Sequence, residues 1–152
     1  ILETLVPERD GERKWSDIQA AVLPEILSKK ENYLISIPTG GGKSVLFQGP
    51  ALYNASYNNH LSLVVTPLKA LMQDQVRELA EKGFYTNVDY LNGDRSYQEV
   101  RSIYRKINSG ELALLYITPE RFRSRAFLNA LTGIYGIRRS TLHFPMGYGI
   151  PS

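Results

Sequence analysis

A glycine-rich segment in the N-terminal half has the residue types that bind a polyphosphate. Its order is Pro38-Thr39-Gly40-Gly41-Gly42-Lys43-Ser44. Glycines carry no Cβ, so their N–H groups can approach phosphate oxygens closely, and the N-terminus of a following helix adds partial positive charge. The Lys43 ammonium would reach the β- and γ-phosphates, and the Ser44 hydroxyl would ligate Mg²⁺. The alternative is a glycine-rich turn before an ordinary helix, but three glycines, a lysine and a serine in this order after an apolar run favour a phosphate-binding loop.

An amide upstream of this loop is a candidate for base recognition. Gln19 offers both a donor and an acceptor, which match the N6 donor and the N7 acceptor of adenine. The alternative is a solvated glutamine on a helix, and the spacing taken by itself favours that alternative.

The elements that must position these residues alternate between apolar strands and amphipathic helices. Strands are expected at 33–37, 61–65, 87–91 and 112–117. Helices are expected from residue 15 onward and at 43–54, 68–82, 96–109 and 120–131, after a lead-in at 1–14. This alternation predicts an α/β fold with a parallel sheet covered on both faces. Ligands of such sheets bind beyond the carboxyl ends of the strands, so the glycine-rich loop, Thr66-Pro67 and Thr118-Pro119, each expected to follow a strand, should lie on one edge.

Capping signals predict where several helices begin and end. The N-cap of the first helix is expected to be Ser16 or Asp17. Its buried face should carry residues spaced four apart, namely Ile18, Val22 and Ile26. The run 96–99 is a capping box of the Ser-x-x-Glu type. Gly83 and Gly110 are expected to end the helices that precede them.

Composition is that of a globular chain with one domain. The 152 residues are 43% hydrophobic and 22% charged, and they contain no cysteine, so neither a disulfide nor a cysteine-ligated zinc site is expected. The lack of cysteine fits the cytosol, so a cytoplasmic protein is expected, associated with the nucleoid if it is bacterial. No apolar run approaches the roughly 18 residues of a membrane span. The net charge of +3 is compatible with nucleic acid, although a mild excess is more often only a solvated surface. The chain opens on Ile1, which leads us to expect a fragment.

Four segments resemble the first four motifs of RecQ-type DNA helicases, which belong to superfamily 2. They are Trp15–Gln19, Pro38–Ser44 with Gln48–Leu52, Val64–Val76 and Leu114–Arg121. Order and spacing agree over roughly residues 15–131, and the stretch 67–76 is the most family-specific. The chain departs from the family at Ser16, where an arginine is usual. Ile37 stands where the strict phosphate-loop pattern has its first glycine, and superfamily 2 also has a small or apolar residue there.

The resemblance implies the first of two RecA-like lobes, which is a three-layer P-loop NTPase lobe with a mostly parallel sheet, here incomplete at its C-terminus. It implies ATP and Mg²⁺ in the cleft between the lobes, single-stranded or duplex-junction DNA and a second helicase lobe as partners, and 3′-to-5′ translocation. Gln19 would contact adenine, Lys43 would act in catalysis and Ser44 would bind the metal. The nucleotide would be held by Pro38, Thr39, Gly40, Gly41, Gly42, Lys43 and Ser44.

The same resemblance assigns a second group of residues to the DNA backbone. They are Thr66, Pro67, Lys69, Thr118, Pro119 and Arg121. Turns at strand ends expose N–H groups and short hydroxyls at phosphate height, and Lys69 and Arg121 add charge. The alternative is that each Thr-Pro pair only ends a strand and caps the next helix, but the repetition at two strands favours a DNA contact.

The pattern breaks after residue 131. An Asp-Glu-Ala-His strand end is expected soon after it, but residues 132–152 contain no acidic residue and no helix or strand period. When the reading frame is moved one nucleotide forward, the codons allowed for Ile134 to Gly147 can encode Tyr-Met-Val-Phe-Asp-Glu-Ala-His-Cys-Ile-Ser-Gln-Trp-Gly. Met146 followed by Gly147 forces the codon TGG in that frame, so the tryptophan is compelled. We therefore interpret 15–131 as a partial helicase lobe and 132–152 as a tail read out of frame, which should leave one sheet position unfilled next to the phosphate-loop strand. The chain alone is expected to bind ATP weakly and not to hydrolyse it. The alternative function is a nucleotide-binding P-loop module that does not act on nucleic acid.

Overall fold

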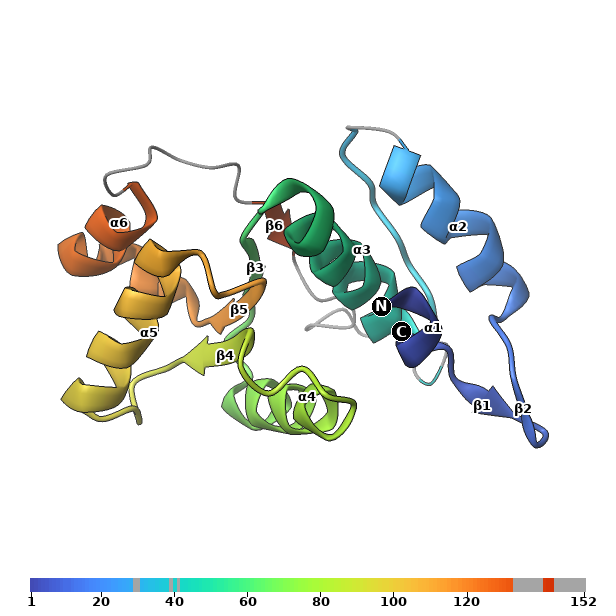
Figure 1. Cartoon of the computed structure of the whole chain (residues 1–152), viewed down its shortest axis with the longest axis horizontal. Coiled ribbons are helices and arrows are strands. Elements are labelled where there is room, and N and C mark those ends of the chain that lie inside the picture. The colour runs from blue at the N-terminus through green and yellow to red at the C-terminus, as the bar shows by residue number, and fades with distance from the viewer. Residues whose placement is uncertain (29–30, 39, 41, 133–140, 144–152) are drawn as a thin grey trace.

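A four-stranded parallel sheet forms the centre of the chain (Figure 1). The computed structural model describes residues 1–28, 31–38, 40, 42–132 and 141–143. The strand order is β4-β5-β3-β6, made of β3 (Ser62–Val65), β4 (Val88–Leu91), β5 (Leu114–Ile117) and β6 (Thr141–His143). Val65 and Leu91 both pair with Ile117, so the carboxyl ends of β3, β4 and β5 lie level at one edge of the sheet. The predicted α/β fold with a parallel sheet is confirmed.

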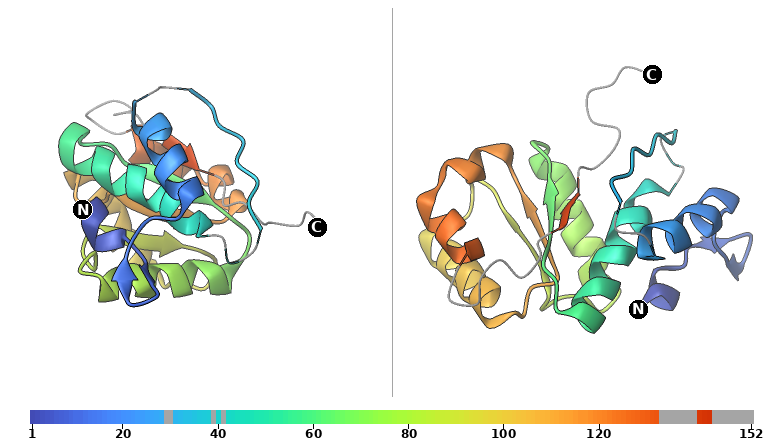
Figure 2. Two further views of the ribbon diagram at one scale, coloured as in Figure 1. Left: turned by 90° about the vertical axis from the view of Figure 1, so that its right-hand side faces the viewer. Right: turned by 90° about the horizontal axis from the view of Figure 1, so that it is seen from above.

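Helices cover both faces of the sheet and make three layers (Figures 1 and 2). On one face, α3 (Lys43–Asn58) and α4 (Lys69–Glu81) enclose a core that includes Val64 and Tyr116. On the other face, α5 (Tyr97–Ser109) and α6 (Arg125–Thr132) enclose a core that includes Ile117 and Phe127. The helices α1 (Leu2–Leu5) and α2 (Asp17–Ser28) pack on the outer side of α3 (Figure 2).

Several helix boundaries follow their sequence signals. The capping box is present, because Ser96 Oγ accepts a hydrogen bond from Glu99 N at 3.2 Å and Glu99 Oε2 accepts one from Ser96 N at 2.7 Å. Gly83 and Gly110 follow α4 and α5 with φ of +98° and +77°, a backbone conformation that glycine adopts without strain. Ser16 caps α2, since its hydroxyl accepts from Gln19 N at 3.2 Å.

The strand predicted at 33–37 is wrong. Residues 31–38 have no regular structure, and Leu34 is 91% exposed, so only Ile35 and Ile37 of this run pack against the core. The place beside β3 is taken by β6, with Ser62 opposite Thr141, and no described strand pairs with residues 31–38. The predicted unfilled sheet position is also wrong, because β6, from the tail itself, fills the place beside β3. The remaining parts of the expected out-of-frame tail, 133–140 and 144–152, lie outside the described residues.

The lead-in contains secondary structure, and two further predictions about elements need correction. The lead-in contains α1 and a hairpin of β1 (Glu8–Arg9) and β2 (Glu12–Arg13), which turns at Asp10-Gly11, where both φ angles are positive as a two-residue turn requires. The buried residues of α2 are Gln19 and Leu23, while Ile18 is exposed, because the face against α3 is rotated by one position from the one expected. The helix expected at 120–131 divides into the 3₁₀ helix η1 (Pro119–Arg123) and α6, because Ser124 accepts from Phe127 N and caps a new helix.

Candidate nucleotide and nucleic-acid sites

The glycine-rich loop leads directly into α3. Gly42 is the residue before the helix and has a φ of +77°, and Gly40 has a φ of +81°. Lys43 and Ser44 form the first turn and are half-buried, while Pro38 is exposed. Free N–H groups of this turn and the positive end of the helix make it suitable for an anion. Thr39 and Gly41, which were also predicted to hold the nucleotide, lie outside the described residues.

Gln19 lies beneath this loop. It is only 1% exposed, so the alternative of a solvated glutamine is wrong. Its Oε1 accepts a hydrogen bond from Ser16 N at 3.0 Å, and its Nε2 donates one to the Gly42 carbonyl at 3.0 Å. A Cβ on Gly42 would lie 2.2 Å from that nitrogen, so the contact requires glycine. Gln19 Oε1 can accept one more hydrogen bond and Nε2 can donate one more, so the adenine contact stays a prediction.

A buried polar network connects the first turn of α3 to α4 and β5. Gln75 Nε2 donates to Ser44 Oγ at 2.8 Å, and Gln75 Oε1 accepts from the Tyr116 hydroxyl at 2.8 Å. Gln48 Nε2 donates to the Tyr116 oxygen at 3.0 Å. Burial raises the pKa of Tyr116 well above its ordinary value, so the phenol stays neutral and available as a donor. Sequence reasoning did not single out Gln48, Gln75 or Tyr116, because their meeting depends on how the helices pack.

A second cation lies beside the loop. Arg9, on β1, has its Nη2 atom 3.5 Å from the position that a Cβ on Gly42 would take. Its Nε is buried and has no hydrogen-bond partner among the described residues. A cation near a helix N-terminus is repelled by the helix dipole unless an anion lies between them, so Arg9 and Lys43 together suit a phosphate. The arginine was not predicted, because no motif marks the hairpin that carries it.

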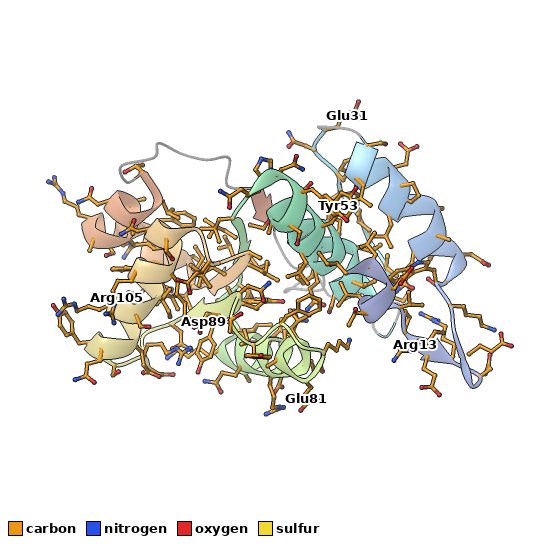
Figure 3. The ribbon with its side chains drawn as sticks, viewed as in Figure 1. Arg13, Glu31, Tyr53, Glu81, Asp89 and Arg105 are labelled. Carbon is orange, nitrogen blue, oxygen red and sulfur yellow. The ribbon has the colours of Figure 1, made fainter. Side chains whose placement is uncertain are left out.

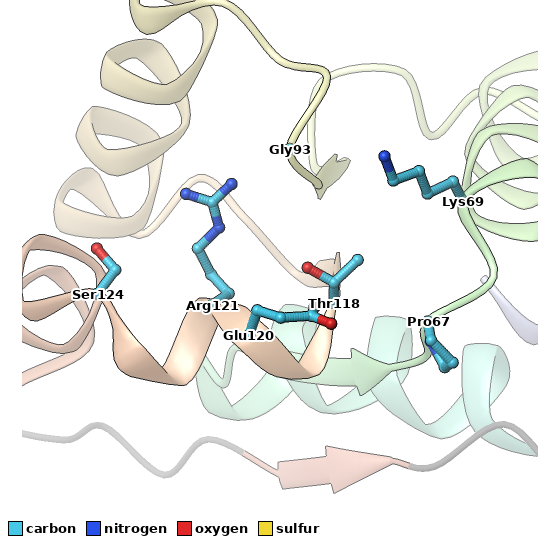
Figure 4. Close-up of a pocket in the computed structure, with 7 residues that line it drawn as sticks. All are labelled: Pro67, Lys69, Gly93, Thr118, Glu120, Arg121 and Ser124. Atoms are coloured by element: carbon cyan, nitrogen blue, oxygen red, sulfur yellow. The ribbon is translucent and has the colours of Figure 1, made fainter.

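The second group of predicted residues meets at the carboxyl ends of the strands. Thr66 N donates to the Ile117 carbonyl at 3.0 Å, which brings the two Thr-Pro segments side by side. They border a pocket (Figure 4), which is lined by Pro67, Lys69, Gly93, Thr118, Glu120, Arg121 and Ser124. Pro119 is exposed at the start of η1. The sheet thus assembles residues that are distant in sequence at one edge.

The threonines of this edge are less accessible than expected. Thr66 and Thr118 are buried, and Thr66 Oγ1 accepts from Leu68 N at 3.2 Å, so its hydroxyl supports the turn into α4. This contact does not cap α4, because its N-cap residue is Leu68 and no side chain caps that helix end, so the DNA contact of the Thr-Pro pairs stays a prediction. The groups of the edge that remain for a ligand are the side chains that line the pocket.

Charges of both signs face this pocket. Lys69 Nζ forms an exposed ion pair with Asp94 at 3.0 Å, and Arg121 Nη2 donates to the Asn92 carbonyl at 2.9 Å. Glu120 is exposed, and its own backbone N–H and the Thr118 hydroxyl hold the pKa of its carboxyl below the ordinary value. Glu120 therefore stays ionised at neutral pH and opposes an anionic ligand, while Lys69 and Arg121 attract one.

The described residues offer few protein ligands for a metal. They contain no group of three or more histidine, cysteine, aspartate or glutamate side chains that could hold an ion. Mg²⁺ commonly takes one or two protein oxygens and completes its shell with phosphate and water, which fits a site where Ser44 is the one predicted ligand. Within the same residues, no helix has the length and apolar character to cross a bilayer.

These segments lie within the part of the chain that matches a known protein family. The sequence model of the DEAD/DEAH box helicase family matches residues 16–137. The match includes the glycine-rich loop, α4 and both Thr-Pro segments.

Individual relatives of this chain are named as ATP-dependent DNA helicases. The chain is 35% identical over 132 residues to the ATP-dependent DNA helicase RecQ of Bacillus subtilis, which covers 87% of this chain and 21% of that protein. Identity to the protein of the same name from Pasteurella multocida is 36%, over 80% of this chain and 18% of that one. Identity to the ATP-dependent DNA helicase Q1 of Pongo abelii is 33%, over 85% and 19%. The chain thus spans about a fifth of the length of these relatives.

Proposed function

Because this chain belongs to the DEAD/DEAH box helicases and is of the RecQ type, we propose that it is the N-terminal lobe of an ATP-dependent DNA helicase, with residues 15–131 as the partial lobe. In this role it binds ATP with a divalent cation, expected to be Mg²⁺, and contacts single-stranded DNA or a duplex junction. The second lobe and 3′-to-5′ movement belong to the same proposal. Action on chromosomal DNA would take place in the compartment that holds it, which is the cytoplasm in a bacterium.

One observation carries the proposal. Two Thr-Pro segments end adjacent strands, and the same parallel sheet supports the helix that begins at Lys43. A nucleotide loop and a charged rim for a phosphate backbone therefore share one rigid support. A nucleotide-binding module that does not act on nucleic acid would not need the residues predicted to contact the DNA backbone.

Each residue of the nucleotide group has a separate role in this proposal. Backbone N–H groups at the start of α3 and the Lys43 ammonium hold the phosphates, and Ser44 supplies one oxygen to the cation. Gln19 fixes the loop through the Gly42 carbonyl and reads adenine with its remaining capacity. The cation, when bound, neutralises charge on the transferred phosphoryl group.

Hydrolysis requires more than these residues. The expected Asp-Glu-Ala-His segment would supply one carboxylate for the cation and another for the attacking water, and residues 132–152 contain no acidic residue. We therefore propose that this chain alone binds nucleotide weakly, does not hydrolyse ATP and does not unwind DNA. The nucleotide sequence of the gene tests whether a frameshift removed this motif. If the shifted frame does not encode Asp-Glu-Ala-His after residue 133, the frameshift hypothesis is rejected.

Binding experiments with the whole chain test the function. Titration with MgATP should give weak saturable binding that Lys43→Ala abolishes, whereas Lys82→Ala, an exposed lysine at the end of α4, should leave it unchanged. Single-stranded DNA should bind with a steep dependence on salt. Nucleotide binding without DNA binding would favour the alternative module, and DNA-stimulated ATP hydrolysis abolished by Lys43→Ala would disprove the proposed inactivity.

A further inference from the structure

We propose that Gln75 is a positioning residue, which orients the Ser44 hydroxyl so that its oxygen faces the divalent cation of the nucleotide. The inference rests on the proposed function, since it concerns the same site. Its basis is the hydrogen bond of 2.8 Å from Gln75 Nε2 to Ser44 Oγ, which joins α4 to the first turn of α3.

The orientation of the Gln75 amide is fixed from its other end. Its Oε1 accepts from the Tyr116 hydroxyl at 2.8 Å and from Gln48 Nε2 at 3.3 Å. Gln48 Nε2 can only donate, and it also donates to the Tyr116 oxygen, which directs the Tyr116 proton toward Gln75 Oε1. A flipped Gln75 amide would place its N–H groups against that Gln48 donor. With the Gln48 amide in this orientation, the Gln75 oxygen faces Tyr116 and the Gln75 nitrogen faces Ser44.

Burial makes this orientation rigid. Tyr116 is fully buried, and Gln48 and Gln75 are 5% and 7% exposed. Buried polar groups that lose a partner are costly, so the network favours one arrangement over the alternatives. The position of the Gln75 nitrogen is therefore set before any ligand arrives.

A fixed donor decides which part of the Ser44 hydroxyl is free. One lone pair of Oγ accepts from Gln75, which leaves the second lone pair and the O–H proton. The second lone pair is the only one that can ligate a cation, and the proton is left for a phosphate oxygen or water. Without Gln75, the hydroxyl would rotate among its staggered positions, and each cation contact would require ordering it.

The position of Gln75 in the chain adds a consequence. The helix that carries it begins at Lys69, on the border of the strand-end pocket. Helix α4 therefore contacts Ser44, the predicted metal ligand, and also carries Lys69, a positive charge at the strand-end pocket. A structural role that only ties α3 to α4 would act on stability and not on the metal dependence of binding.

The test measures how strongly Mg²⁺ enhances nucleotide binding by the 152-residue chain. The affinity for a fluorescent ATP analogue is measured with magnesium chloride and with EDTA, and their ratio is the enhancement. Gln75→Met keeps the volume and removes the donor, and it should lower the enhancement about three- to tenfold, the range of one hydrogen bond, with little change in EDTA. Gln73→Met, exposed on the same helix, is the control and should leave the ratio unchanged.

Two further variants keep the outcome decisive. Gln75→Asn retains an amide that is one methylene too short to reach Ser44, so it should lose enhancement even if Gln75→Met fails to fold. In a Ser44→Ala background, Gln75→Asn should cause no additional loss of enhancement, because the group it positions is gone. Equal losses with magnesium and with EDTA, or an additional loss in the Ser44→Ala background, would overturn the inference. Absence of any nucleotide binding by the unmodified chain would instead reject the proposed function.

Discussion

Arg121 Nη2 donates a hydrogen bond of 2.9 Å to the backbone carbonyl of Asn92, which joins the turn after β5 to the turn after β4. The carbonyl belongs to a fully buried residue, so the bond is part of the fold as well as of the rim. Arg121 is half-buried, and its guanidinium has further N–H groups that could donate to a phosphate oxygen.

Arg121→Gln should therefore reduce both stability and DNA affinity. Loss of the bond to Asn92 should lower the free energy of unfolding by about 1 kcal/mol, and loss of a charge-assisted phosphate contact should weaken single-stranded DNA binding several-fold. Urea denaturation and fluorescence anisotropy measure the two effects. Arg123→Gln, exposed on the same 3₁₀ helix, is the control, and an equal effect of both variants on DNA affinity would indicate only general attraction by charge.

The Lys69–Asp94 ion pair should modulate the affinity for DNA at the strand-end pocket. Lys69→Gln should flatten the plot of log affinity against log salt by about 0.7, the value for one phosphate contact on a single strand. Asp94→Asn should tighten binding, because it removes a negative charge and releases the ammonium. Lys82→Gln, at the opposite end of α4, should leave the slope unchanged. A slope that does not respond to Lys69→Gln would remove this residue from the DNA group.

Arg9 should contribute to nucleotide binding through charge. Arg9→Gln should weaken binding of ATP about five- to thirtyfold while leaving binding of adenosine unchanged, since the guanidinium lies beside Gly42 and would act on phosphates. Arg13→Gln is a matched control, because Arg13 is an exposed arginine on the second strand of the same hairpin (Figure 3). Calorimetric titration measures both ligands. Equal losses for ATP and adenosine would show that Arg9 supports the hairpin rather than the phosphates.

Phe127 should be a main stabilising contact of α6. Its side chain is fully buried, with ring centroids 6.0 Å from Phe122 and 6.4 Å from Tyr104. Phe127→Ala should lower the free energy of unfolding by about 3 to 5 kcal/mol through lost burial and a cavity. The neighbouring Leu128 is 39% exposed, so Leu128→Ala should have a much smaller effect in the same urea titration.

The capping box of α5 should make stability depend on acidic pH. Hydrogen bonds from the backbone and hydroxyl of Ser96, and then from Arg95, lower the pKa of Glu99 below its ordinary value of 4.5. Because the folded pKa is lowered, the contribution of Glu99 is present above 4.5 and is lost as pH falls below it. Glu99→Gln should therefore be less stable than the unmodified chain at neutral pH, and the difference should shrink on acidification. Thermal melts at neutral pH and near pH 3 measure the trend, and a difference independent of pH would assign the effect to helix propensity.

Local chemistry in the sequence determined much of this molecule. Apolar runs followed by Thr-Pro predicted β3 and β5, and Gly83, Gly110 and the Ser96–Glu99 box predicted helix ends, because each signal acts within a few residues. The order of glycines, Lys43 and Ser44 likewise predicted a loop that opens a helix. Asp10-Gly11 was a readable hairpin signal that we missed.

Only the tertiary structure decided the remaining features. Whether 33–37 forms a strand depends on pairing with a distant segment, and β6 is the segment that pairs with β3. The burial of Gln19 against Gly42, the position of Arg9 and the network from Ser44 through Gln75 to Tyr116 depend on how separate helices and strands pack. Sequence patterns report propensity and periodicity along one segment, whereas the hydrogen bonds that orient these side chains join segments far apart in the chain.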